Sequence, residues 1–272
     1  MKKDTVEKYI RFTLIPDFGI LSQNRLLEMC GNIDNCFILS LEDFLCMNKN
    51  ADKNTRISRE RIEKFVNFRE SQEIIEKTQM VIEDCKSKGI EIITKDSNKY
   101  PNRIGGLTDM PLVLYVKGNL KINEYNRSIG VVGARRCSRE GKATSIEATE
   151  NELKNGSAII SGMAKGIDSY AHTAAIINKG YTIAVLGNGP DVCYPKEHDK
   201  LYEMVVENGC VLSEYLPGTT PRNYMFPKRN RLIAALSDVL YVVDIGTHSG
   251  TETTVEACRT YKRKIIRLQA GI

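Results

Sequence analysis

The chain has 272 residues, of which 42% are hydrophobic and 27% charged, a composition typical of a folded globular protein rather than a disordered chain. No apolar run approaches the roughly 20 residues that span a bilayer, and residues 1–12 carry four cations and two anions instead of an apolar signal sequence, so we expect a cytoplasmic protein without membrane contacts. The net charge is +5, and residues 101–272, with 22 basic and 17 acidic side chains, hold the whole excess; this charge permits a polyanionic partner but does not establish one.

The eight cysteines are scattered along the chain, with no Cys-x-x-Cys pair and no histidine cluster nearby. Metal sites and disulfide frameworks both need closer or more regular spacing. We therefore expect reduced, mostly buried thiols, no metal ion and no cofactor.

Residues 1–80 are expected to form a small helical domain, because apolar side chains recur there at helical spacing. Polar or proline- and glycine-containing loops separate the periodic segments. The predicted helices are Val6–Leu14, Leu21–Cys30, Ser40–Met47 and Ser58–Ile82.

Residues 81–272 change to short β-branched runs that alternate with amphipathic stretches, which predicts a doubly wound, mostly parallel α/β sheet. The expected strands are Ile90–Thr94, Leu112–Val116, Ser128–Val132, Ser157–Ile160, Thr182–Leu186, Val211–Leu212, Val239–Val243 and Ile265–Leu268. The expected helices are Glu140–Asn155, Ser169–Lys179, Glu197–Asn208, Lys228–Leu236 and Thr251–Tyr261. Ligands of such sheets bind outside the carboxyl ends of the strands, so the residues there are the candidate site.

The segment Gly130–Ser138 follows the first central strand and combines a glycine turn with two adjacent arginines. Gly133 lies at the turn, Arg135 and Arg136 suit a phosphate, and Ser138 is placed to cap the next helix. Free amides at that helix start form an anion site. The segment lacks the Gly-x-Gly-x-x-Gly pattern of a dinucleotide site, and a tight turn with solvated arginines explains it equally well.

The segment Ile160–His172 repeats this arrangement after the next strand. Gly162 and Gly166 permit close backbone approach, and Lys165 can contact a phosphate. Asp168 or Ser169 is expected to cap the following helix, and His172, one turn on, is more often a packed residue than a catalyst.

Two further loops follow later strands. Gly187–Pro195 is expected to be a rigid turn. Pro217–Arg231 contains four cations and two aromatic residues in 15 positions, a mixture that suits the phosphates and bases of a single strand. Cations at the start of a helix are unfavourable unless an anion binds there, and we expect them to be at least partly exposed because an unpaired cation is costly to bury.

The last candidate segment, Gly246–Glu256, starts the final helix and offers Ser249, Gly250 and Thr251 to an anion. The sequence has no Gly-x-x-x-x-Gly-Lys-Ser/Thr loop and no Gly-x-Ser-x-Gly elbow. Three scattered histidines provide little general-base capacity. The coincidence of five such strand ends is therefore more informative than any one of them.

These motifs, in this order, resemble the DNA-processing protein A (DprA/Smf) family, and the resemblance covers roughly residues 90–268. The matching segments are Tyr100-Pro101, Met110–Gly118, Val132–Arg135, Ser161–Asp168 with Ala171-His172, Tyr194-Pro195, Ser213–Tyr215, Phe226–Arg231 and Ser249–Thr251. The helical residues 1–80 are similar to the SAM-like or helix-hairpin domain that such proteins often carry.

The resemblance implies an extended Rossmann-like domain over residues 81–272 that binds single-stranded DNA without chemistry on it. It also implies a homodimer that protects incoming strands in natural transformation and loads RecA recombinase. In the family the equivalents of Arg135, Lys165 and the Arg-Asn-Arg segment line the DNA pocket. The expected DNA-contacting residues are Gly133, Arg135, Arg136, Ser138, Ser161, Gly162, Lys165, Gly166, Lys228, Arg229, Asn230, Arg231, Ser249, Gly250 and Thr251, supported by Asp168 and His172.

Two alternatives remain open. Gly250–Glu256 is similar to the Gly-Thr-x-x-Glu motif of LOG-type nucleotide phosphoribohydrolases, in which Glu252 or Glu256 would act as the acid or base. However, Glu256 lies five residues after Thr251 rather than three. The second alternative is a nucleotide-sensing domain of a defence system that signals through the helical N-terminus.

Overall fold

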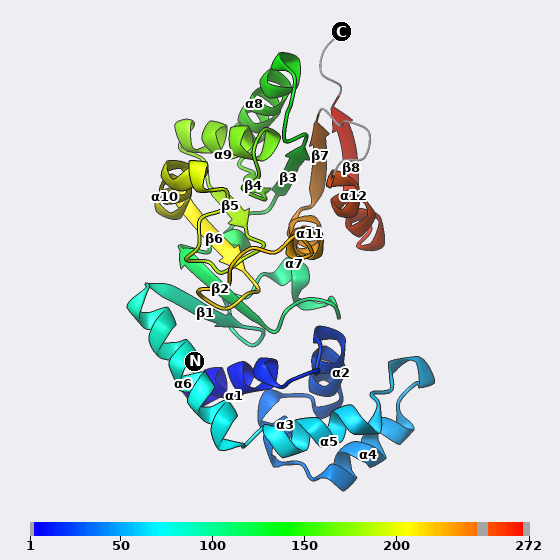
Figure 1. Cartoon of the computed structure of the whole chain (residues 1–272). Coiled ribbons are helices and arrows are strands. Elements are labelled where there is room, and N and C mark those ends of the chain that lie inside the picture. Colours follow the sequence, from blue (N-terminus) through cyan, green and yellow to red (C-terminus); the bar gives the residue numbers. More distant parts are fainter. Residues whose placement is uncertain (1–2, 244–249, 269–272) are drawn as a thin grey trace. The chain divides into compact units, whose positions relative to one another are not determined.

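The computed structural model describes residues 3–243 and 250–268 (Figure 1). Its N-terminal region is entirely helical, as expected. The helices are α1 (Lys3–Leu14), α2 (Ile20–Cys30), α3 (Ile33–Ile38), α4 (Leu41–Asn50), α5 (Arg59–Phe68) and α6 (Gln72–Ser87), with a 3-10 turn at Lys53–Thr55.

Aromatic side chains from several of these helices pack around Phe65 of α5. Its ring centroid lies 5.0 Å from that of Phe12 and 5.8 Å from that of Phe44. The Arg69 guanidinium stands over the Phe65 ring at 5.7 Å. Such aromatic contacts give a small domain a core despite its short helices.

Two details of this region differ from the sequence prediction. The single helix predicted over Ser58–Ile82 is wrong, because the chain breaks between α5 and α6, where the Ser71 hydroxyl caps the new helix by accepting from the Ile74 amide. Helix α3 was not predicted; its six residues are too few to show a period, and Asn32 caps it.

The rest of the chain contains an eight-stranded sheet in the order β1-β2-β6-β5-β4-β3-β7-β8. The central pairs are parallel, and β2 pairs with β6 antiparallel. The expected α/β fold with a mostly parallel sheet is confirmed. The strands are β1 (Ile90–Thr94), β2 (Val113–Gly118), β3 (Ser128–Gly133), β4 (Ala158–Ser161), β5 (Thr182–Val185), β6 (Gly209–Ser213), β7 (Val239–Val243) and β8 (Lys264–Leu268).

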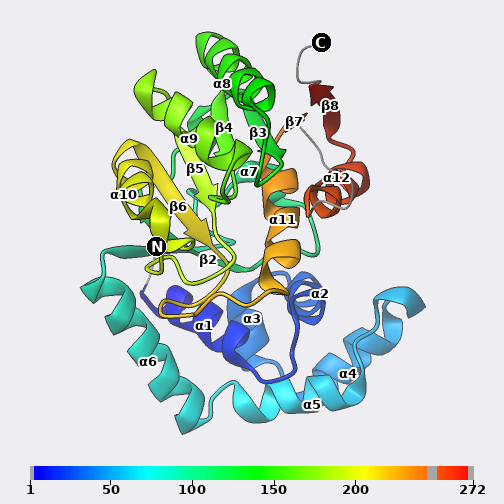
Figure 2. The ribbon, with the colours of Figure 1, turned by 45° about the horizontal axis from the view of Figure 1, so that its top comes forward.

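Helices cover both faces of the parallel part of the sheet: α8, α9 and α10 lie on one face and α11 and α12 on the other (Figures 1 and 2). Ile129, Ile159 and Ala171 belong to a core cluster under α8 and α9, and Met163 and Tyr202 to a second cluster near α10. The helices are α7 (Asn102–Gly105), α8 (Arg139–Lys154), α9 (Ile167–Ile177), α10 (Asp199–Asn208), α11 (Met225–Leu236) and α12 (Thr251–Thr260), with 3-10 turns at Ile122–Glu124 and Lys196–His198.

Strand order reverses between β3 and β7. The chain leaves β3 through α8 toward β4, whereas it leaves β7 in the opposite direction through α12 toward β8. The two connections therefore lead away from β3 and β7 in opposite directions along the sheet, and the crevice outside the carboxyl ends of two such neighbouring strands is the usual ligand position in these sheets.

Contacts within the chain divide it into two compact units. The first contains residues 1–88, 92–100 and 105–114, and the second contains residues 89–91, 101–104 and those from 115 onward. The division at residue 80 expected from the sequence stays a prediction. Among the described residues, no helix combines the length and apolar character that crossing a membrane requires.

Candidate functional site

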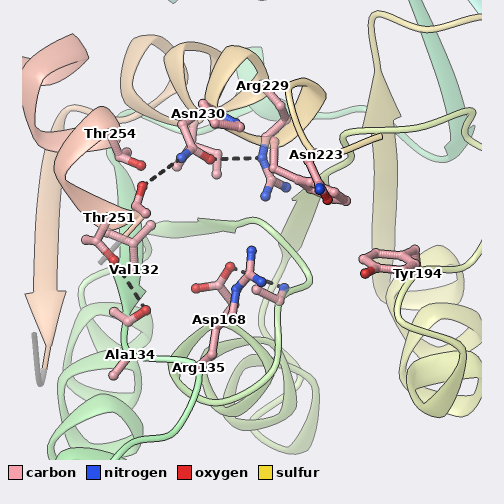
Figure 3. A pocket seen from close by; sticks show the side chains of 16 residues that line it. Val132, Ala134, Arg135, Asp168, Tyr194, Asn223, Arg229, Asn230, Thr251 and Thr254 are labelled. Carbon is pink, nitrogen blue, oxygen red and sulfur yellow. Dashed lines mark hydrogen bonds between the residues drawn. The ribbon is translucent and has the colours of Figure 1, made fainter. Parts of the chain in front are cut away.

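A pocket of about 550 Å³ opens at this crevice in the second unit (Figure 3). Five segments contribute to it, one after each of the strands β3, β4, β5, β6 and β7. Its lining residues are Val132, Gly133, Ala134, Arg135, Ala164, Asp168, Tyr194, Asn223, Phe226, Pro227, Arg229, Asn230, Ile233, Gly250, Thr251 and Thr254.

The loop after β3 forms one wall of the pocket. Arg135 is exposed there and lines the pocket with its free guanidinium, and the carbonyl oxygen of Gly133 accepts a hydrogen bond from the Thr251 hydroxyl at 3.3 Å. Just beyond, Ser138 caps α8 by accepting from the Gly141 amide at 2.9 Å, as predicted. Arg136 is exposed but does not line the pocket.

Arg229 occupies the floor of the pocket, and the expectation that it would be partly exposed is wrong. Only 4% of the residue is accessible. Its Nη1 donates to the carbonyl oxygens of Gly162, at 2.6 Å, and Val185, and its Nε donates to Asn230 Oδ1 at 3.1 Å. Burial lowers the pKa of Arg229 to about 10. These carbonyls supply the compensation that permits an arginine to be buried.

Two glycines allow this packing, so the close approach expected of Gly162 and Gly166 is confirmed. A Cβ on Gly162 would lie 2.6 Å from an Arg229 guanidinium nitrogen. Gly166 has φ = +79° and packs directly on the carbonyl oxygen of Ala134. A larger side chain at either position would displace an element of the pocket.

Among the described residues that line the pocket, Asp168 is the acidic one, and it is 6% exposed. Its Oδ2 accepts from the amides of Gly162 and Ala164, at 3.1 and 3.3 Å, so it closes the loop before α9. The predicted cap on α9 is wrong: the N-cap is Gly166, without a side-chain bond. Burial raises the pKa of Asp168, and the nearby Arg229 charge offsets part of that effect.

Three expected cations form ion pairs. Lys165, which borders a smaller adjacent pocket of about 80 Å³, pairs with Glu197 at 2.9 Å. Arg231 and Lys228 share Glu214, at 2.7 and 3.8 Å, and do not line either pocket. The carboxylate of Glu214 therefore balances the charge of Lys228 and Arg231 at the start of α11, where the sequence predicted a bound anion.

Other expected residues lie outside the pocket. Ser161 is buried, and its hydroxyl donates to the Val131 carbonyl oxygen at 2.6 Å. His172 is buried against the Thr182 hydroxyl at 2.8 Å, and burial lowers its pKa to about 3. Ser249 falls outside the described residues.

Several pocket residues were not assigned to the site from the sequence. Tyr194 and Phe226 form an aromatic pair, with ring centroids 5.3 Å apart, that lines both pockets. Both belong to motifs that were noted, but nothing in the sequence showed that the two loops meet. Thr254 follows Thr251 by three residues, so helical spacing could have placed it on the same face.

The glutamates of the enzymatic alternative point to other partners. Glu252 pairs with Arg267 at 3.5 Å and Glu256 with Arg259 at 3.0 Å, both at exposed positions, and neither lines the pocket. No group of three or more potential metal ligands is present in the described part of the chain.

Comparison with known proteins gives a consistent set of relatives. The model of the DNA recombination-mediator protein A family matches residues 91–272. DNA processing protein DprA of Streptococcus pneumoniae is 40% identical over 173 residues, which are 64% of this chain and 61% of that protein. DprA of Bacillus subtilis is 31% identical over 216 residues, 79% of this chain and 73% of that protein. The match to protein Smf of Synechocystis covers 48% of that protein. This chain therefore spans about three fifths of the Streptococcus pneumoniae relative and about half of the Synechocystis relative.

Two solved structures have a similar fold. The X-ray structure of DprA from Streptococcus pneumoniae has a TM-score of 0.64 and 29% identity, covering 91% of this chain and 86% of that one. DNA processing protein A from Helicobacter pylori, described for its single-stranded DNA binding mode, has a TM-score of 0.60 and 29% identity, covering 65% and 80%.

Proposed function

The chain belongs to the DNA recombination-mediator protein A family, and from this membership we propose that it binds single-stranded DNA in the pocket at the carboxyl ends of β3 and β7. The single observation that carries the proposal is the make-up of that pocket. It places the exposed guanidinium of Arg135 beside the aromatic pair of Tyr194 and Phe226. The Helicobacter pylori relative, which binds single strands, supports the same choice of ligand.

The chemistry of the pocket suits a nucleotide strand. A planar guanidinium and backbone amides bind phosphate oxygens, and an aromatic ring stacks on any base without selecting its sequence. Asn230 is fixed by bonds from its amide to the Gly250 carbonyl and the Thr253 hydroxyl. Asn230 is therefore not free to read a base edge, and because phosphate contacts carry no sequence information we expect binding with little sequence preference.

The protein is proposed to hold the strand without cleaving or modifying it. Asp168, the acid among the described pocket residues, already accepts two backbone amides, and Glu252 and Glu256 pair with arginines away from the pocket. A general acid or base must reach the proton that it transfers. Base release from a panel of nucleotides, followed by chromatography, should be absent; release that disappears in Glu256→Gln would establish the enzymatic alternative.

We extend the proposal to the biological setting that family membership suggests. The protein would act in the cytoplasm as a homodimer, protect single strands in natural transformation and load RecA recombinase onto them. RecA-dependent strand exchange on DNA coated with single-strand-binding protein tests the loading step, and sedimentation velocity tests the dimer.

The central experiment is a fluorescence-anisotropy titration with a single-stranded oligonucleotide and a duplex of the same length. We expect tighter binding of the single strand. If about four phosphates are neutralised, log K against log salt should have a slope near −3, at roughly −0.7 per phosphate. Arg135→Ala should weaken binding, and Lys86→Ala, an exposed lysine on α6 of the first unit, is the matched control. Equal affinity for duplex, or a slope near zero, would contradict the proposal.

A further inference from the structure

Four cations occur within eight residues after β3, at Arg135, Arg136, Arg139 and Lys142, with Glu140 as the single acidic residue among them. All four cations are exposed. In the part of the chain that the structure describes, none of the four forms an ion pair, whereas Lys165, Lys228 and Arg231 each pair with a carboxylate. The loop after β3 and the first turn of α8 therefore carry a cluster of four unpaired cations, whereas the described segment that leads into α11 contributes one exposed cation without an ion pair, Arg222.

An aromatic side chain lies within this charged surface. The Lys142 ammonium stands over the Tyr170 ring, 4.8 Å from its centroid. Lys142 belongs to α8 and Tyr170 to α9, two helices that lie side by side (Figure 2). One turn further on, the Ser145 hydroxyl donates to the Ile167 carbonyl oxygen at 3.4 Å, which joins the two helices along this seam.

The contact between α8 and α9 at Lys142 and Tyr170 lies next to the loop that lines the pocket. The Ile167 amide donates to the Ala134 carbonyl oxygen at 3.2 Å, and a Cβ on Gly166 would lie 2.7 Å from the carbonyl oxygen of Arg135. The Tyr170 amide in turn donates to the Gly166 carbonyl oxygen at 3.1 Å. One helical turn, about 5.4 Å of rise, thus separates the Tyr170 backbone from the loop that carries Arg135.

We propose that Arg136, Arg139, Lys142 and Tyr170 form a second contact segment for single-stranded DNA, reached by the strand as it leaves the pocket past Arg135. Tyr170 would stack on one base, and the three cations would contact the adjoining phosphates. This inference rests on the proposed function and deepens it, because it names the surface that the strand crosses after it leaves the pocket.

The chemistry favours a nucleic acid over another polyanion. An acidic peptide would pair its carboxylates with the cations but would offer no aromatic group to stack on Tyr170. A single strand offers a phosphate and a base at every nucleotide. A duplex keeps its bases stacked inside the helix, so it could use the cations without the ring. The contribution of Tyr170 should therefore be specific to single strands.

The test compares two lengths of labelled oligothymidine, one of about four nucleotides and one of about fifteen, the range of site sizes for single-strand binders. Tyr170→Ala should weaken binding of the longer strand by about fivefold or more, the low end for loss of one stacked base, and should leave the short strand unaffected. Tyr170→Phe should bind like the unmodified protein, because stacking needs the ring and not the hydroxyl. Arg135→Ala should weaken both lengths.

Salt dependence separates the charged contact from the stacked one. For the longer strand, Lys142→Ala should reduce the magnitude of the salt slope by about 0.7, the value for one phosphate, while Tyr170→Ala should leave the slope unchanged. Lys154→Ala is the matched control, an exposed lysine at the far end of the same helix.

The outcomes distinguish the inference from the function on which it rests. If the unmodified protein binds no single strand of either length, the proposed function fails. If it binds but Tyr170→Ala and Lys142→Ala match the Lys154→Ala control on the longer strand, or weaken both lengths equally, the second contact segment is overturned.

Discussion

The two arginines of the pocket differ in burial, and this difference separates their effects on folding and on binding. Arg229→Met should lower the free energy of unfolding by about 3–5 kcal/mol, because it leaves Asp168 and two backbone carbonyls without their buried cation. Arg135→Ala, at an exposed position, should change stability by less than about 0.5 kcal/mol and weaken single-strand binding by about 1–3 kcal/mol. Urea unfolding and anisotropy measure the two quantities; equal stability losses would contradict this assignment.

His172 should make stability depend on pH. Its folded-state pKa is about 3, against an ordinary value of 6.5, because burial disfavours the charged form. A depressed pKa contributes stability that is full above pH 6.5 and is lost as the pH falls toward 3, by up to about 1.4 kcal/mol per pH unit. Urea unfolding at pH 7.5 and at pH 5 measures how far the free energy of unfolding falls between the two pH values. This fall should be about 2 kcal/mol smaller in His172→Gln than in the unmodified protein. The same loss in both proteins would exclude His172 as the cause.

At the scale of elements, long periodic segments were predictable and short ones were not. Helices α8 to α12 were all anticipated, with ends that shifted by a few residues. The break between α5 and α6 was missed because apolar spacing continues through Arg69, whose side chain donates to the carbonyl oxygens of Cys36 and Leu39. The local signal at this break, the Ser71 N-cap of α6, was outweighed by the continuing apolar spacing, and the contacts of Arg69 lie 30 or more residues away in the sequence.

The start of α8 offers a test of one element. Ser138 accepts from the Gly141 amide as the N-cap, so Ser138→Ala should destabilise the protein by about 1 kcal/mol. Ser138→Asp keeps the cap and so should retain stability, but its added negative charge should weaken single-strand binding if phosphate approaches this loop. Thermal unfolding and anisotropy on the same two variants distinguish the roles. Unchanged DNA affinity in Ser138→Asp would place the strand elsewhere.

For the whole molecule, the sequence predicted which strand ends meet but not how their side chains pair. The α/β alternation was enough to bring Gly133, Arg135, Asn230 and Thr251 to one pocket. It could not show that Arg229 turns inward, because its carbonyl partners lie 67 and 44 residues away. Charge counting likewise missed Glu214, which follows β6 and compensates Arg231 on α11.

The residues that belong to each of the two units predict which segments lose their contacts when the chain is shortened to residues 81–272. Segments 92–100 and 105–114 group with the N-terminal helices, and buried Asn24 of α2 joins both: its Nδ2 donates to the Met110 carbonyl oxygen at 2.8 Å, and its Oδ1 accepts from Lys95 Nζ at 2.9 Å. A fragment of residues 81–272 lacks Asn24 and so leaves that carbonyl unsatisfied, at a cost of about 1–3 kcal/mol.

Hydrogen exchange should therefore show that the fragment of residues 81–272 loses amide protection in segments 92–100 and 105–114. Protection in β3, β4 and β5 should persist, since those strands pair with one another within the second unit. Asn24→Ala in the full chain is the matched variant and should reproduce part of the loss. Because every pocket residue belongs to the second unit, the fragment should still bind single-stranded DNA. Full protection of segments 92–100 and 105–114 in the fragment would instead show that the boundary near residue 80 is the physical one.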